Sequence, residues 1–126
     1  MKKIIYLLIA LLFVGGVVFV IVSPGKTVTG KYDAFAKCIK DSGAKLYGAF
    51  WCPHCQAQKA RFGTSEKYLP YIECSTPDGQ GQTQACKDAG ITTYPTWQFA
   101  NSTTTEVGEK ELAELASSTG CILPPQ

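Results

Sequence analysis

Residues 47–59 read Tyr-Gly-Ala-Phe-Trp-Cys-Pro-His-Cys-Gln-Ala-Gln-Lys, and this stretch decides the fold. The run from Lys45 to Trp51 that leads into it is short and apolar, which is typical of a buried strand. A helix should begin directly after Cys52, because Pro53 suits the first turn of a helix and the following residues continue it. The Cys-x-x-Cys pair is therefore expected where a strand passes into the beginning of a helix.

The rest of the chain alternates between helical and extended patterns. Apolar spacing and terminal glycines predict helices over 31–42, 83–90 and 109–118, and strands over 71–75, 93–99 and 104–107. The first two strands are joined through a helix and should be parallel, whereas the last two should form an antiparallel hairpin. The prediction is an α/β fold with a mixed four-stranded sheet flanked by helices on both faces.

Composition narrows the class of protein. The chain has 126 residues, of which 45% are hydrophobic and 17% charged, as expected for one folded domain rather than a disordered chain. The formal net charge is only +2, and no basic block follows Lys2 and Lys3. A nucleic-acid-binding protein normally carries a concentrated basic patch, so we expect no nucleic-acid partner.

The N-terminal segment is strongly apolar. From Ile4 to Val22 the chain has 19 residues without a charge, and as a helix they would span roughly 28 Å, close to the ~30 Å hydrocarbon core of a bilayer. We predict a transmembrane anchor and linker over 1–25 and a globular domain over 26–126. A cleaved signal peptide is the alternative, but its apolar region is usually shorter, and no small-residue cleavage site precedes Pro24.

The same segment predicts the location of the domain. Lys2 and Lys3 should keep the N-terminus in the cytoplasm, so the anchor would cross the membrane once. The domain would then lie outside the cytoplasm, in a periplasm, a lumen or at the cell surface. All six cysteines belong to this domain, which fits a compartment where disulfides persist.

Phe50-Trp51-Cys52-Pro53-His54-Cys55, followed about 40 residues later by Tyr94-Pro95-Thr96, resembles the thioredoxin fold with its Cys-x-x-Cys motif and cis-proline. The chain is more closely similar to the thioredoxin-like domain that is fused to, or found beside, homologues of vitamin K epoxide reductase. The similar stretches, which lie within residues 30–121, are YGAFWCPHCQAQK, YIECS, CK, GITTYPTW and ELAELASSTGC.

Disulfide exchange requires an attacking thiolate, and a helix N-terminus favours negative charge. We therefore interpret Cys52 as the nucleophile and Cys55, one turn further along, as the resolving thiol. Pro53 and His54 complete the motif, and His54 is expected to add a positive charge or a donor near the thiolate.

Other readings of this pair are weaker. A structural disulfide remains open, but a zinc site normally needs four ligands and there is no second Cys-x-x-Cys. Haem attachment needs a histidine directly after the second cysteine, where this chain has Gln56. We expect neither a metal nor a cofactor.

The resemblance also implies which residues meet the substrate. Pro95 would be the cis-proline that presents a backbone edge to the partner polypeptide, and Tyr94 would face the substrate. An ordinary trans-proline at a strand start is the alternative. Trp51 is either a contact residue or part of the core. One position departs from the thioredoxin pattern, because Leu46 replaces the buried acid that assists proton transfer to the resolving thiol.

Four further cysteines remain, and six cysteines allow 15 complete pairings. The resemblance implies a disulfide between Cys74 and Cys86, and Cys38 would then pair with Cys121. Both pairs are expected to be structural. An alternative use of Cys74 and Cys86 is as a second redox relay.

The expected function is an anchored thiol–disulfide oxidoreductase that oxidises the thiols of exported proteins. The resemblance implies reoxidation by a quinone-linked membrane partner of the vitamin K epoxide reductase type. A disulfide reductase, as in cytochrome c maturation, and a non-catalytic adaptor that delivers copper are the alternatives. Copper would require more soft or imidazole ligands than one histidine and Met1 supply.

Overall fold

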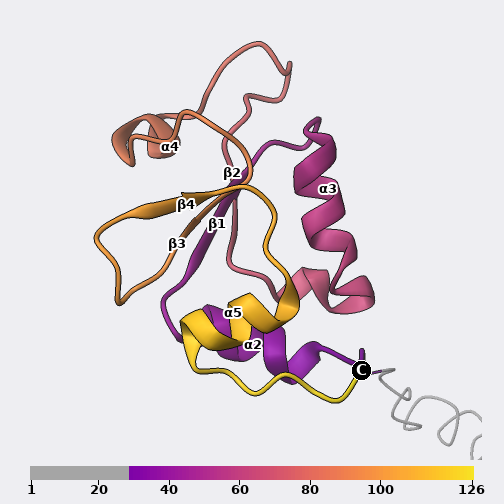
Figure 1. Ribbon diagram of the computed structural model, residues 1–126. Helices are drawn as coiled ribbons and strands as arrows, with labels where there is room; N and C mark the ends of the chain where they lie inside the picture. Colours follow the sequence, from indigo (N-terminus) through magenta and orange to yellow (C-terminus); the bar gives the residue numbers. More distant parts are fainter. Residues whose placement is uncertain (1–28) are drawn as a thin grey trace, which may run out of the picture.

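The computed structural model describes residues 29–126, so the anchor expected over 1–25 lies outside the described residues. Between residues 29 and 126, none of the helices has the length and hydropathy needed to cross a bilayer. In chain order the elements are α2 (Asp33–Asp41), β1 (Lys45–Gly48), α3 (Pro53–Ala60), the 3-10 helix η1 (Gly63–Tyr68), β2 (Tyr71–Glu73), α4 (Gln84–Asp88), β3 (Thr96–Gln98), β4 (Thr105–Val107) and α5 (Leu112–Thr119) (Figure 1).

The strands form one mixed sheet in the order β2-β1-β3-β4. β1 pairs with β2 in parallel, whereas the β1–β3 and β3–β4 pairs are antiparallel. A mixed four-stranded sheet flanked by helices fits the expected thioredoxin-like α/β fold.

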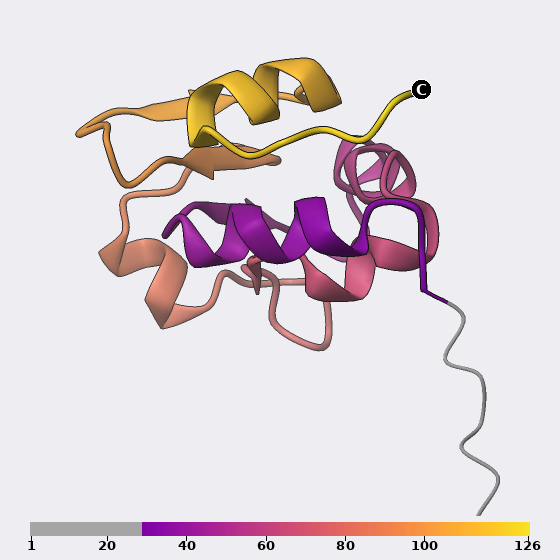
Figure 2. The same ribbon diagram turned by 90° about the horizontal axis from the view of Figure 1, so that it is seen from below.

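The sheet separates two apolar layers. The larger core lies on the face that carries Leu46 and Trp97, both 0% exposed, and α2 and α5 pack there. α2 and α5 lie side by side (Figure 2). On the other face, Tyr47 packs with Ile91 and with the Cys74–Cys86 disulfide, which joins the residue after β2 to α4. This alternation follows from the period of two along a strand.

The bounds of several elements differ from the sequence-based expectation, and one element was not expected. β1 ends at Gly48 instead of Trp51, because the chain turns there and the Cys52 N–H donates to the Ala49 carbonyl at 3.0 Å. β3 begins only at Thr96, since Pro95 has no N–H to donate to a ladder and the Tyr94–Pro95 bond is cis. The 3-10 helix η1 was not predicted, because GTSEKY lacks apolar residues at helical spacing.

Candidate functional site

Cys52 lies where β1 has ended and α3 begins. It is the N-cap of α3, Pro53 follows in the first turn, and only 6% of Cys52 is exposed. Its Sγ donates to the Tyr94 carbonyl at 3.8 Å, although the two residues are 42 positions apart in the sequence. Unpaired N–H groups at a helix N-terminus stabilise a nearby negative charge, so the position suits a thiol that reacts as thiolate.

Cys55 lies one turn further along α3 and is 0% exposed. Both Cys52 and Cys55 are free thiols in this structure, so it shows the dithiol form of the pair. Burial away from water, the largest cause, raises the pKa of the Cys55 thiol to about 12, and the neighbouring Cys52 and the charge of Glu73 raise it further. Cys55 therefore needs a proton acceptor before it can attack a sulfur atom at neutral pH.

The residues expected to meet the substrate surround Cys52. The cis Tyr94–Pro95 peptide lies against the two cysteines, and Tyr94 packs on the small cluster of Ala49, Cys52 and Cys55. Trp51 is 51% exposed, and its ring meets that of Tyr94 edge to face at 6.1 Å between centroids. An exposed aromatic side chain beside a reactive sulfur is available to a partner polypeptide.

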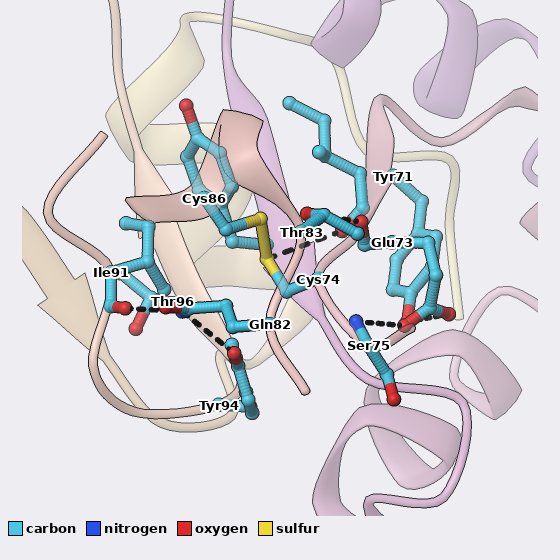
Figure 3. Close-up of a disulfide and its surroundings, with 12 residues drawn as sticks. Tyr71, Glu73, Cys74, Ser75, Gln82, Thr83, Cys86, Ile91, Tyr94 and Thr96 are labelled. Carbon is cyan, nitrogen blue, oxygen red and sulfur yellow. Dashed lines mark hydrogen bonds between the residues drawn. A yellow bond between two sulfur atoms is a disulfide. The ribbon is translucent and has the colours of Figure 1, made fainter. Parts of the chain in front are cut away.

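The segment closed by the Cys74–Cys86 disulfide positions both aromatic residues. The Ser75 hydroxyl accepts a hydrogen bond from Trp51 Nε1 at 2.9 Å. Gln82 donates to the Tyr94 hydroxyl at 2.8 Å (Figure 3). Sequence reasoning missed Ser75 and Gln82, because nothing in a polar loop indicates which side chains turn toward the site.

The other four cysteines form two disulfides. Cys38 is joined to Cys121, which ties α2 to the residue that follows Gly120, the C-cap of α5. Cys74 is joined to Cys86, with both residues 0% exposed. A buried disulfide behind the sheet has no access to an external thiol, so this geometry favours a structural role for Cys74 and Cys86 over a relay.

His54 is largely exposed, and its ring pairs with an acid. It is 73% exposed, and its Nδ1 lies 2.8 Å from a carboxylate oxygen of Glu109, which also pairs with Arg61 at 3.1 Å. The expected donor to the Cys52 thiolate is thus engaged by an acid from the segment between β4 and α5. Sequence reasoning missed Glu109, because the contact joins residues 55 positions apart.

Neutralising Glu109 should weaken the folded state in a pH-dependent way. The hydrogen bond with His54, and then that with Arg61, holds the pKa of Glu109 below its ordinary value of 4.5. A depressed folded-state pKa stabilises the fold above the unfolded-state value and loses that effect as the pH falls through the folded-state value. We expect Glu109→Gln to unfold at slightly lower urea than the parent at neutral pH, and the two midpoints to converge as the pH falls below 4.5.

Urea titrations at a series of pH values would check this. Glu66→Gln, on an exposed residue of η1, is the matched control and should follow the parent throughout. A gap between Glu109→Gln and the parent that stays constant into the acid range would contradict the assignment.

Within residues 29–126, no group of three or more His, Cys, Asp or Glu side chains is arranged to hold a metal ion.

Comparisons with known proteins agree with this chemistry. No protein-family model matches the chain. Over 92 residues the sequence is 48% identical to Thiol-disulfide oxidoreductase LTO1 of Arabidopsis thaliana, a match that covers 69% of this chain and 24% of the plant protein. The chain thus spans about a quarter of the length of this relative. The similarity supports an oxidoreductase enzyme of the thiol–disulfide class.

Proposed function

We propose that this protein is an extracytoplasmic thiol–disulfide oxidoreductase that donates disulfides to exported proteins. The observation that carries the proposal is the arrangement of Cys52 and Cys55 at the beginning of α3, facing the cis Tyr94–Pro95 peptide. Cys52 lies nearer the surface than Cys55, which is fully buried. An incoming thiolate therefore meets Cys52 first.

In the oxidised protein, a substrate thiolate attacks Cys52 Sγ and forms a mixed disulfide. The Cys52–Cys55 bond breaks, its electron pair leaves on Cys55, and Cys55 takes up one proton. A second substrate thiolate then attacks the substrate sulfur of the mixed disulfide, so the substrate leaves with a new disulfide and Cys52 leaves as thiolate. Two electrons have passed from the substrate to the Cys52–Cys55 pair.

The two structural disulfides support the proposed compartment. Cys38–Cys121 and Cys74–Cys86 would persist in an oxidising environment and would rarely survive in a reducing cytosol. A domain that itself depends on disulfides works where disulfides are made. The apolar segment from Ile4 to Val22 supplies a means of export, and as an anchor it would hold the domain at the membrane surface.

Reoxidation requires an electron acceptor that this chain does not supply. We propose a quinone-linked integral membrane oxidoreductase of the vitamin K epoxide reductase type, which the sequence resemblance supports. In that step the Cys52 thiolate attacks a disulfide of the partner, and Cys55 then closes the Cys52–Cys55 bond while the partner keeps both electrons. Anchoring both proteins in one membrane raises their effective concentration.

The redox state of Cys52 and Cys55 in quinone-depleted membranes tests this proposal. With quinone present, alkylation of the full-length chain should find Cys52–Cys55 largely oxidised; after quinone depletion the pair should accumulate as dithiol. A Cys55→Ser chain should accumulate mixed disulfides through Cys52 with exported proteins and with an integral membrane protein. A dithiol that is insensitive to quinone would point instead to a disulfide reductase.

A further inference from the structure

Cys55 must gain and lose a proton during disulfide exchange. The buried acid that assists this proton transfer in the thioredoxin pattern is absent from this chain. Leu46 occupies that position, and it is 0% exposed within the larger core. β1 and β2 are paired in parallel, with Leu46 beside Tyr71 and Gly48 beside Glu73. Because side chains alternate along a strand, Tyr71 and Glu73 point to the same face of the sheet as Leu46.

Gly48 allows Cys55 and Tyr71 to approach each other. A Cβ atom on Gly48 would lie 2.9 Å from Cys55 Sγ and 3.0 Å from the Tyr71 hydroxyl oxygen, so both atoms border the same small space. Any side chain at residue 48 would fill it. The thiol and the phenol are thus neighbours across a glycine, beneath the beginning of α3.

Glu73 completes the arrangement. Tyr71 donates its hydroxyl hydrogen to Glu73 Oε2 at 3.2 Å. The other oxygen, Oε1, accepts from the Phe50 N–H at 3.2 Å. It also accepts from the Ser75 N–H at 2.8 Å (Figure 3). Three donors therefore point at the one carboxyl group of Glu73, and its oxygens accept all three hydrogen bonds.

We infer that Tyr71 and Glu73 form the proton path of Cys55 and replace the missing acid at residue 46. To resolve a mixed disulfide, the Cys55 S–H gives its proton to the Tyr71 oxygen as the Tyr71 O–H gives its own to Glu73. The Cys55 thiolate attacks Cys52 Sγ, the Cys52–Cys55 bond forms, and the partner sulfur leaves with the electron pair of the broken bond. In the reverse step Glu73 returns the proton.

The charges around the path are consistent with this role. Burial, and then the charge of Glu73, raise the pKa of the Tyr71 phenol, so it stays protonated and acts by exchanging protons. Lys59 Nζ lies over the Tyr71 ring at 4.9 Å from its centroid. Cys52 and Tyr94 also pack around Cys55, and neither lies on β2.

A single-turnover assay on the full-length protein isolates the step. Dithiobis-nitrobenzoate reacts with the reduced Cys52–Cys55 pair in two stages, each releasing one coloured thionitrobenzoate. The first release is the attack of Cys52 on the reagent. The second is the attack of Cys55 on the mixed disulfide, so it alone requires removal of the proton from Cys55. The comparison of the two rates across pH therefore separates the proton path from the reactivity of Cys52.

We expect Glu73→Gln and Tyr71→Phe to slow the second release near neutral pH by a factor on the order of 10², as for the loss of an internal acid–base group. The first release should stay within about twofold of the parent rate. The deficit should shrink as the pH rises, because hydroxide then removes the proton. Glu106→Gln, on the opposite edge strand β4, and Tyr68→Phe in η1 are matched controls that should leave both releases unchanged.

Parent rates for the second release in both variants, or a deficit that is the same at every pH, would overturn the inference. If Glu73→Gln does not fold, its first release is lost as well, and Tyr71→Phe then gives the test because it removes only the hydroxyl. The inference rests on the proposed exchange chemistry but not on its direction. A reductase would still need the path, so a failed proposal for disulfide donation and a failed proton path give different results.

Discussion

Replacing Cys52 with serine should abolish disulfide transfer to a reduced substrate protein and leave only the uncatalysed rate of oxidation in the buffer. Cys52 is the less buried of the two free thiols, and it lies at the N-cap of α3 beside the Tyr94 carbonyl. A serine hydroxyl is a poor nucleophile near neutral pH and cannot form a mixed disulfide. The measurement is the oxidation of a reduced model protein by the oxidised full-length chain.

Cys55→Ser is the informative partner variant. It keeps Cys52 and the helix beginning, so it should still form mixed disulfides but release them slowly, because no resolving thiol remains. The thermal unfolding midpoints of both variants should stay near that of the reduced parent. Transfer by Cys52→Ser at the parent rate would mean that another cysteine reacts with the substrate.

Removing the Cys38–Cys121 disulfide should lower the free energy of unfolding more than removing the Cys74–Cys86 disulfide. The bridge closes 83 residues of sequence, whereas Cys74–Cys86 closes 12. In the chain-entropy treatment these loops correspond to about 4–5 and about 3 kcal/mol of stability respectively. For a domain whose total stability is about 5–15 kcal/mol, the larger loss leaves a marginal fold.

The measurement is urea unfolding of the paired variants Cys38→Ala/Cys121→Ala and Cys74→Ala/Cys86→Ala under conditions that keep the remaining bridge oxidised. The first pair should have the lower unfolding free energy. The second should also slow substrate oxidation, because the Cys74–Cys86 segment carries Ser75 and Gln82, which hold Trp51 and Tyr94. A larger stability loss in the second pair would contradict the loop-length argument.

Much of the fold could be predicted from short-range features of the sequence. The apolar run before Cys52, Pro53 in the first helical turn and the glycines after helices each act within a few residues, so the order of elements and the mixed sheet could be predicted. The cis state of the Tyr94–Pro95 bond is different. Most X–Pro bonds are trans, and only the family resemblance indicated otherwise.

Contacts set by strand register could not be predicted. Glu73 looks like an ordinary polar residue in the sequence YIECS, and only its pairing with Gly48 places it beneath Cys55. Likewise, Glu109 follows a turn and reaches His54 because β4 and the beginning of α5 bring it there. Both acids affect the site through three-dimensional proximity, for which the sequence has no periodic or motif signal.

The reduction potential of the Cys52–Cys55 pair in the full-length protein tests the central claim most directly. Equilibration in glutathione buffers, followed by Trp51 fluorescence, should give a value above roughly −200 mV, as expected when the dithiol is the stabilised form and disulfides are donated. A value near or below about −270 mV, in the range of thioredoxin, would make the protein a reductase and contradict both disulfide donation and the quinone-linked partner.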